Sequence, residues 1–197
     1  MRFSVLVLVL ALSEAGSAAS VQTRAPSAAS LDNAAEKPVA VIQSYRNGLG
    51  GVHTANPEVQ LTVGRDPSMR DESVLFVDYP MPTGDPAGRD VRCDAETLDW
   101  SGGRAIAFQI KPSHALRLSV SFLDRNNVVY TTWAELKGDV WQPVRIMLDA
   151  IRPNPYFQPP NAKRGSPLDV SDVKFIAFSP QDRMSGRLAI SRFVVVK

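Results

Sequence analysis

The sequence predicts an all-β protein in which two antiparallel sheets pack face to face as a sandwich. Three observations lead to this prediction. Apolar and polar residues alternate from Leu116 to Phe122, which puts the apolar side chains on one face of a strand. Further short apolar runs follow at close spacing, separated by turn sequences such as Asp124–Asn127. Finally, the chain shows no amphipathic helical pattern.

The expected strands can be placed in order along the chain. The first lies around Val39 and Val41 and ends at a glycine-rich turn that contains Gly48, Gly50 and Gly51. This turn is not a phosphate-binding loop, because no Lys-Ser or Lys-Thr pair follows it and no helix pattern begins after it. The remaining expected strands are 59–63, 74–79, 91–95, 104–110, 116–122, 128–136, 141–148, 174–178 and 187–196.

One connection is long for a compact domain. The segment from Arg152 to Pro167 contains five prolines and two aromatic residues, Tyr156 and Phe157. Loops of this length are uncommon and are often functional. The two aromatic side chains could therefore cover a bound ligand, or they could pack on their own loop.

The first 18 residues are predicted to be a secretory signal peptide. Arg2 supplies a positive charge, residues 3–12 form an apolar run too short to span a bilayer, and small residues occupy positions 16–19. The alternatives are an uncleaved anchor or an N-terminal core strand. Residues 19–37 are predicted to be a flexible linker, and residues 38–197 the folded domain. The mature protein is therefore expected to be secreted or periplasmic, with no membrane span.

The charge balance and the single cysteine narrow the possible functions. The chain has 22 basic and 20 acidic residues, a formal net charge of +2, so nucleic acid is not an expected partner. Cys93 is the only cysteine and cannot form an internal disulfide. The sequence places neither His53 nor His114 beside it, so Cys93 is predicted to be buried and unreactive.

The sequence does not favour an enzyme. Glycoside hydrolysis needs two carboxylates that face one cleft, and Glu135 is the only glutamate in the C-terminal half. The two histidines lie far apart and outside any metal-binding spacing, and the chain has no Gly-x-Ser-x-Gly nucleophile elbow. The protein is therefore predicted to bind a partner without catalysing a reaction.

The order of the later elements resembles a known group of domains. A strand at residues 105–110 is followed by LRLSVSFLD, a tyrosine-containing strand, WQPVRIML, PLDVSDVKFIAFSP and finally GRLAISRFVVVK. This order resembles the galactose-binding-like jelly rolls, and among them the carbohydrate-binding modules related to family 11 and the complex I intermediate-associated protein domain. The resemblance covers residues 38–197. It implies a jelly-roll fold that binds a glycan or, alternatively, a protein partner.

Two departures from the pattern of these domains bear on calcium. Many such modules carry an acidic residue in the last strand, where this chain has Ile190–Phe193. The first strand usually offers Asp or Glu near its end, where this chain has Ser44–Asn47. Calcium is bound mainly through carboxylate oxygens, and Arg46 and Arg192 add positive charge to these two places. A structural calcium ion is therefore disfavoured, and no cofactor is expected.

Strand parity suggests which side chains form a binding face. If the alternating apolar residues point into the core, then aromatic, basic and acidic side chains point outward from three strands. Sugar rings pack on aromatic faces, while guanidinium and carboxylate groups bind hydroxyls or anionic substituents. The candidate ligand-binding residues on one sheet face are Arg117, Trp133, Glu135, Trp141 and Arg145, with Tyr79 at a loop edge. The alternatives are that the indoles are packing residues and that Arg117 and Glu135 form only a cross-strand ion pair.

Overall fold

The computed structural model describes residues 38–197, apart from residues 70–71, 84–85 and 96–98. The predicted signal peptide and linker lie outside these described residues. The described chain forms two antiparallel sheets and two short 3₁₀ helices, η1 (Pro86–Arg89) and η2 (Leu148–Ala150). The predicted all-β sandwich is therefore confirmed. In this part of the chain, no helix has the length and apolar character needed to cross a bilayer.

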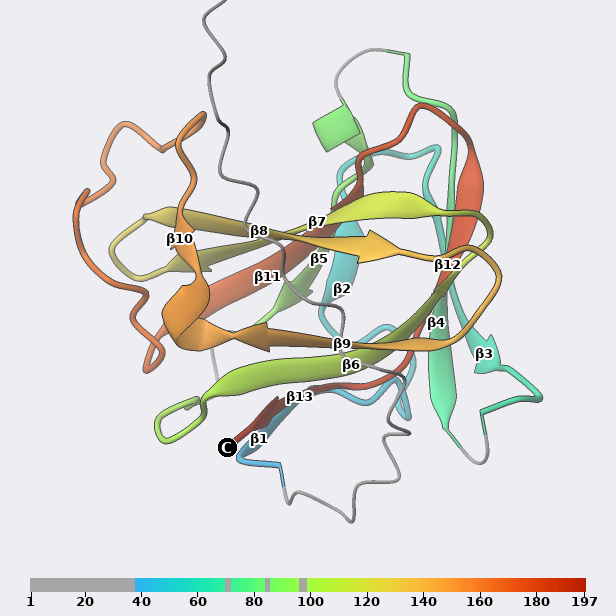
Figure 1. The fold of residues 1–197 in the computed structure, drawn as a ribbon, viewed down its shortest axis with the longest axis horizontal. Coiled ribbons are helices and arrows are strands. Elements are labelled where there is room, and N and C mark those ends of the chain that lie inside the picture. Colours follow the sequence, from blue (N-terminus) through green and yellow to red (C-terminus); the bar gives the residue numbers. More distant parts are fainter. Residues whose placement is uncertain (1–37, 70–71, 84–85, 96–98) are drawn as a thin grey trace, which may run out of the picture.

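Figure 1 shows how the two sheets pack against each other. Sheet A consists of β1 (Ala40–Gln43), β3 (Gln60–Arg65), β4 (Ser73–Tyr79), β6 (Ala105–Pro112), β9 (Gln142–Met147), β12 (Gly186–Ile190) and β13 (Phe193–Val196). Sheet B consists of β2 (Val52–Thr54), β5 (Val91–Asp94), β7 (Leu116–Asp124), β8 (Val129–Leu136), β10 (Arg152–Pro153) and β11 (Val173–Pro180). The order in sheet A is β1-β13-β6-β12-β4-β3, with β9 also paired to β6, and the order in sheet B is β10-β8-β7-β11-β5-β2.

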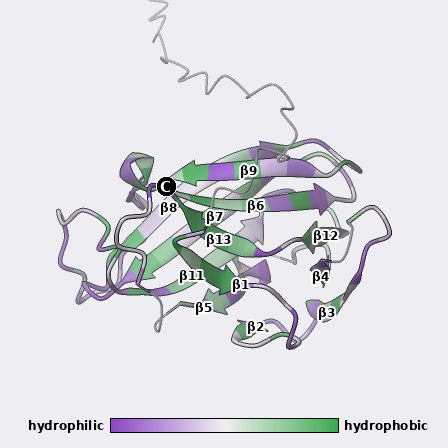
Figure 2. Cartoon of the chain, turned by 90° about the horizontal axis from the view of Figure 1, so that it is seen from below, coloured by the Kyte–Doolittle hydropathy of each residue, from purple (hydrophilic) through white to green (hydrophobic). Residues whose placement is uncertain are grey.

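The core between the sheets is built from alternate residues of their strands. On β7, Leu118, Val120 and Phe122 are fully buried, whereas the residues between them face outward. Burial of these apolar side chains is the main stabilising contribution to a fold of this kind. Figure 2 shows a similar alternation along β9, whereas β1 and β13 are hydrophobic over most of their length.

The structure contains three features that the sequence pattern did not predict. The short strand β2 pairs with β5 just after the glycine-rich turn. Strand β10 pairs with β8 despite Pro153, which is possible because β10 lies at the edge of sheet B. The last expected strand is divided into β12 and β13, and between them the Ser191 N–H donates to the Gln109 carbonyl (2.9 Å) while the Ser191 hydroxyl accepts from the Gln109 N–H (2.9 Å).

Two connections decide which side chains share a surface. Consecutive strands β8 and β9 belong to different sheets, so residues 137–141 cross from sheet B to sheet A. The long β10–β11 loop, residues 154–172, projects at one end of the sandwich, away from β3 and β4 at the other end (Figure 1).

Cys93 on β5 is buried in the core, as the sequence predicts. Its side chain is 2% exposed, and burial raises the pKa of the thiol to about 12. A protonated and buried thiol is a poor nucleophile. We expect the native protein to resist labelling by Ellman's reagent at mildly alkaline pH and to react fully after unfolding in guanidinium chloride. Rapid labelling of the native protein, at the rate seen with free glutathione, would contradict this placement.

Candidate functional site

The register of sheet B determines which side chains point away from the core. Residues paired directly across neighbouring strands lie on the same face, so the partners of the outward-facing Ser119 and Ser121 also point outward. We call this surface the open face of sheet B. Its side chains are His53, Arg92, Asp94, Phe175, Ala177, Ser179, Arg117, Ser119, Ser121, Leu123, Val129, Thr131, Trp133, Glu135 and Arg152.

Small side chains line the middle of the open face. Ser119 and Ser121 on β7 lie between Ala177 and Ser179 on β11 and the β8 strand that carries Thr131. The Ser121 and Thr131 hydroxyl oxygens are 3.0 Å apart. Ala177 and Ser179 are each only 4% exposed although they point outward. We call these five residues the serine strip, and they form a polar floor between taller neighbours.

Trp133 stands on one side of the serine strip. It pairs with Ser119 across the β7–β8 ladder, and 41% of its surface is exposed. The guanidinium of Arg117 lies 4.9 Å from the centre of the indole ring, and Arg117 Nε lies 3.2 Å from Glu135 Oε1. The cross-strand ion pair that was one alternative is therefore present. Since both charged side chains are largely exposed, the pair adds little stability, and its main effect is to hold Arg117 beside the indole.

A second arginine–aromatic pair stands on the other side of the strip. The guanidinium carbon of Arg92 on β5 lies 5.0 Å from the centre of the Phe175 ring on β11. Nearby, His53 Nδ1 lies 3.9 Å from Asp94 Oδ1. Strands β5 and β8 are three strand spacings apart, which places Arg92 and Trp133 roughly 14 Å from each other across the sheet. Aromatic and charged groups thus flank the polar floor on both sides.

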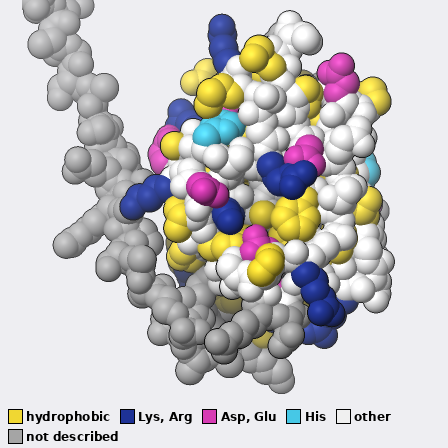
Figure 3. All heavy atoms as spheres, turned by 90° about the vertical axis from the view of Figure 1, so that its right-hand side faces the viewer, with side chains coloured by type: hydrophobic (Ala, Val, Ile, Leu, Met, Phe, Trp, Pro, Cys, Tyr) yellow, Lys and Arg dark blue, Asp and Glu magenta, His cyan; other side chains and the backbone are white. Residues whose placement is uncertain are grey.

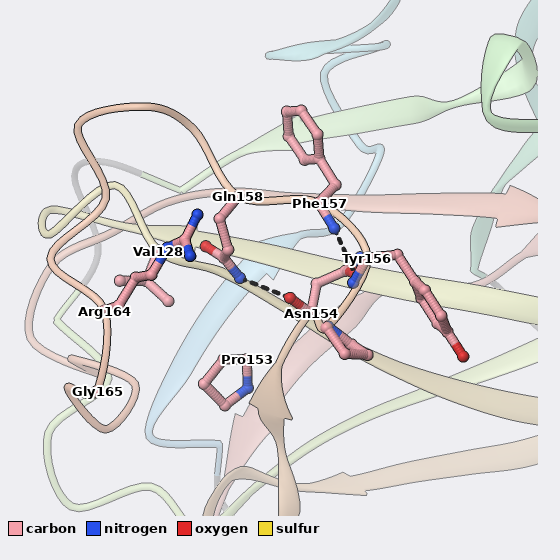
Figure 4. Close-up of a pocket in the computed structure, with 9 residues that line it drawn as sticks. Val128, Pro153, Asn154, Tyr156, Phe157, Gln158, Arg164 and Gly165 are labelled. Atoms are coloured by element: carbon pink, nitrogen blue, oxygen red, sulfur yellow. Dashed lines mark hydrogen bonds between the residues drawn. The ribbon is translucent and has the colours of Figure 1, made fainter.

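The β10–β11 loop adds a pocket at the edge of the open face. Asn154 Nδ2 donates a hydrogen bond to Thr131 Oγ1 (3.0 Å), which joins the loop to the serine strip. Gln158 Nε2 donates to the Val129 carbonyl (2.7 Å), and Gln158 Oε1 accepts from the Val129 N–H (3.0 Å). Figure 4 shows the pocket of about 270 Å³ that lies between the two limbs of this loop, with Arg164 on its wall.

Two neighbouring aromatic side chains project from this loop. Tyr156 is 88% exposed and Phe157 is 62% exposed, so neither packs on its own loop. Their N–H groups donate to Asn154 Oδ1 (2.8 and 3.1 Å), which fixes a tight turn. In Figure 4 the two rings point away from this turn in different directions. Exposed aromatic residues on a fixed loop are typical of a contact surface.

Two candidate residues from the sequence lie off sheet B: Arg145 is on β9 of sheet A, and Trp141 immediately precedes β9. The expectation that Trp141 and Arg145 share a face with Trp133 is wrong, because β9 pairs with β6 in sheet A. Arg145 Nη2 donates to the Lys197 carbonyl (2.7 Å). Trp141 is half-buried, and its indole Nε1 is enclosed. Neither side chain can reach a ligand bound over the serine strip.

Tyr79 lies at the end of β4, beside a loop, but its side chain is buried and does not reach the open face. It is 3% exposed at the end of β4, and burial raises the pKa of its hydroxyl well above the usual value. The Arg89 guanidinium lies 5.0 Å from the centre of its ring, and the His114 ring lies 6.4 Å away. His114 is hydrogen-bonded in turn to Asp182. Tyr79 therefore belongs to a buried polar cluster that holds the β11–β12 loop.

The side of the molecule formed by β3, β4 and β12 carries mixed charges. Arg187 contacts both carboxylate oxygens of Asp78, through Nε (2.6 Å) and Nη2 (2.8 Å). Figure 3 shows acidic and basic side chains interspersed on this side of the molecule rather than gathered by sign. This described surface therefore lacks the cluster of like charges that is needed to bind a highly charged polymer such as a nucleic acid.

The described residues include no group of three or more His, Cys, Asp or Glu side chains that could hold a metal ion. At the two places considered for calcium, the residues have other partners. Arg192 Nε lies 3.6 Å from Glu72 Oε1, and the Ser44 N–H donates to Gln43 Oε1 (2.9 Å).

The chain matches no protein-family model and no curated protein sequence, so its likeness to known proteins rests on solved structures. A family 11 carbohydrate-binding module of a cellulosomal cellulase from Clostridium thermocellum is similar with a TM-score of 0.62 and 17% identity, over 80% of this chain and 94% of that chain. A structure of a family 11 module from the same organism, in complex with a β-1,3-1,4-mixed-linked tetrasaccharide, gives 0.61 and 17%, over 79% and 94%.

A family 30 carbohydrate-binding module is similar with a TM-score of 0.53 and 15% identity, over 82% of this chain and 85% of that chain. These likenesses show that the chain has the galactose-binding-like jelly-roll fold, so the resemblance to carbohydrate-binding modules is confirmed at the level of fold. The resemblance to the complex I intermediate-associated protein domain stays a prediction.

Proposed function

We propose that this protein is a non-catalytic carbohydrate-binding protein that takes a glycan across the open face of sheet B. The observation that carries the proposal is the position of the exposed Trp133 beside the hydroxyl-lined serine strip. The C–H face of a sugar ring packs on the indole, while its hydroxyls exchange hydrogen bonds with Ser119 and Glu135. The similar modules are named as carbohydrate-binding, and one holds a tetrasaccharide.

The position of the acidic groups supports binding without catalysis. Glu135 and Asp94 are the carboxylates on the described open face, and they lie on β8 and β5. Three strand spacings separate these strands, so the two carboxylates are roughly 14 Å apart or more. The paired carboxylates of glycoside hydrolases are separated by about 5–10 Å, so Glu135 and Asp94 cannot act together on one glycosidic bond.

Trp133→Ala is expected to weaken glycan binding by about tenfold or more, because it removes the aromatic platform beside the strip. Binding would be measured by isothermal titration calorimetry against soluble oligosaccharides: mixed-linked β-glucan, xylan, agarose and oligogalacturonate fragments. Trp141→Ala is the matched control, since it removes an indole that immediately precedes β9 of sheet A and should leave the affinity unchanged.

Equal losses in the two tryptophan variants would mean that binding does not depend on the open face. No heat with any oligosaccharide would reject carbohydrate binding and favour the alternative, a protein-interaction domain. In that case Tyr156 and Phe157, the exposed aromatic residues of the β10–β11 loop, become the expected contact residues.

A further inference from the structure

The open face of sheet B carries an excess of positive charge. Three arginines point outward from it, namely Arg92, Arg117 and Arg152. They are accompanied by two carboxylates, Asp94 and Glu135. The face therefore has a formal charge of +1 with His53 neutral, counted over its described residues.

Each of the two carboxylates lies close to a basic side chain, and in neither case is that side chain Arg92. Glu135 Oε1 is 3.2 Å from Arg117 Nε, and Asp94 Oδ1 is 3.9 Å from His53 Nδ1. Arg92 forms no ion pair and no side-chain hydrogen bond with any residue that the structure describes. No carboxylate among the described residues of the open face therefore neutralises the charge of Arg92.

The position of Arg92 suits the binding of an anion. Its guanidinium makes a cation–π contact with the Phe175 ring, whose centre is 5.0 Å from the guanidinium carbon. A contact with an aromatic ring restricts a guanidinium without using its N–H groups as hydrogen-bond donors to a protein acceptor. Arg92 pairs with Ala177 in the ladder, so its backbone lies next to the serine strip, and its half-buried side chain places the guanidinium over Phe175.

We propose that the glycan bound on the open face is acidic, and that Arg92 binds its carboxylate or sulfate group. This inference rests on the proposed function and specifies its ligand class. A planar guanidinium binds either anion through two parallel N–H···O hydrogen bonds, and these are stronger than bonds to a neutral hydroxyl. Trp133, roughly 14 Å away across the strip, takes another ring of the same chain.

The test compares acidic glycans with neutral forms of the same backbone. For the carboxylate, the probes are oligogalacturonates and their fully methyl-esterified forms; for the sulfate, they are κ-carrageenan oligosaccharides and their desulfated forms. In at least one pair, the acidic form is expected to bind about tenfold or more tightly. The preference is expected to shrink as salt rises, because screening weakens the attraction between charges.

Variants of Arg92 assign the preference to this residue. Arg92→Gln is expected to abolish the preference for the acidic form, and Arg92→Lys to keep part of it, because the point charge stays but the planar fork is lost. Arg65→Gln is the control, since Arg65 is an exposed arginine on β3 in sheet A. The salt dependence of the unmodified protein needs no variant and remains informative if Arg92→Gln folds poorly.

Each outcome is decisive. Equal affinity for the acidic and neutral forms in both pairs, with binding still lost in Trp133→Ala, overturns the inference and leaves the proposed function standing. An acidic preference that Arg92→Gln leaves intact also overturns the role of Arg92. If no glycan of either charge binds, both the inference and the proposed function are rejected.

Discussion

Replacing Arg89 by methionine is expected to destabilise the protein by about 3–5 kcal/mol. Arg89 is 1% exposed, and its Nη2 donates to the carbonyls of Pro180 (2.8 Å) and Asp182 (2.6 Å), while Nη1 donates to the Met184 carbonyl (2.8 Å). Methionine fills the space but leaves these carbonyls and Asp182 Oδ1 without the guanidinium donor, while Asp182 Oδ2 keeps its hydrogen bond with His114. Urea unfolding followed by tryptophan fluorescence measures the effect.

Two comparisons make the Arg89 experiment specific. Arg65→Met removes an exposed arginine from β3 and is expected to change the free energy of unfolding by no more than about 0.5 kcal/mol. The double variant Arg89→Met with Asp182→Asn should cost less than the sum of the single variants, because the two side chains are ion-paired at 3.2 Å. A cost for Arg89→Met similar to that of Arg65→Met would show that the cluster does not hold the β11–β12 loop.

Asp124→Ala is expected to cost about 3 kcal/mol or more, because one buried carboxylate satisfies several donors at once. Asp124 is 0% exposed. Its Oδ1 accepts from the N–H groups of Asn126 (2.9 Å) and Val128 (3.2 Å), and its Oδ2 accepts from the Asp169 N–H (3.2 Å). The Tyr130 hydroxyl lies 3.5 Å from Oδ2 but donates to the Ser166 carbonyl (2.8 Å). Alanine leaves these three backbone N–H groups without their acceptor, which urea unfolding would detect.

The Asp124 substitution should also loosen the end of the β10–β11 loop, since it removes the acceptor of the Asp169 N–H. We expect trypsin to cleave after Lys163 or Arg164 faster in Asp124→Ala than in the unmodified protein. Asp149→Ala, a change at an exposed aspartate, is the control. Asp124→Asn keeps one acceptor oxygen, so its stability and its cleavage rate should lie between those of Asp124→Ala and Asp149→Ala. Equal stability and equal cleavage in the Ala variants at 124 and 149 would contradict this role.

Most strands of this fold could be predicted from the sequence, and the exceptions have a physical cause. The two-residue period of β7 identifies both the strand and its buried face. Strands β2 and β10 have three and two residues, too few for any period, and they exist because β5 and β8 offer them unpaired edges. The break at Ser191 depends on its bonds to Gln109 on another strand, which no local pattern encodes.

The candidate site was predictable only in part, because strand parity tells which way a side chain points but not which sheet its strand joins. Parity places Arg117, Trp133 and Glu135 outward, as the structure has them. Parity also places Arg145 outward from β9, but a period of two does not tell which sheet a strand joins. The partnership of Arg92 with Phe175 was missed because it joins residues 83 positions apart in the sequence. The signal peptide and the export that it implies stay predictions.

In the β10–β11 loop, the side chains that are exposed for contact are not the ones that anchor the loop to the fold. Tyr156 and Phe157 meet solvent in the folded protein much as they do in the unfolded chain, so their rings contribute little hydrophobic stabilisation. Asn154 and Gln158 hold the loop instead, through hydrogen bonds to the backbone and side chains of β8 and of the loop itself. Positions 156 and 157 can therefore change identity at little cost to the fold, which makes them the place where this scaffold could acquire a different ligand.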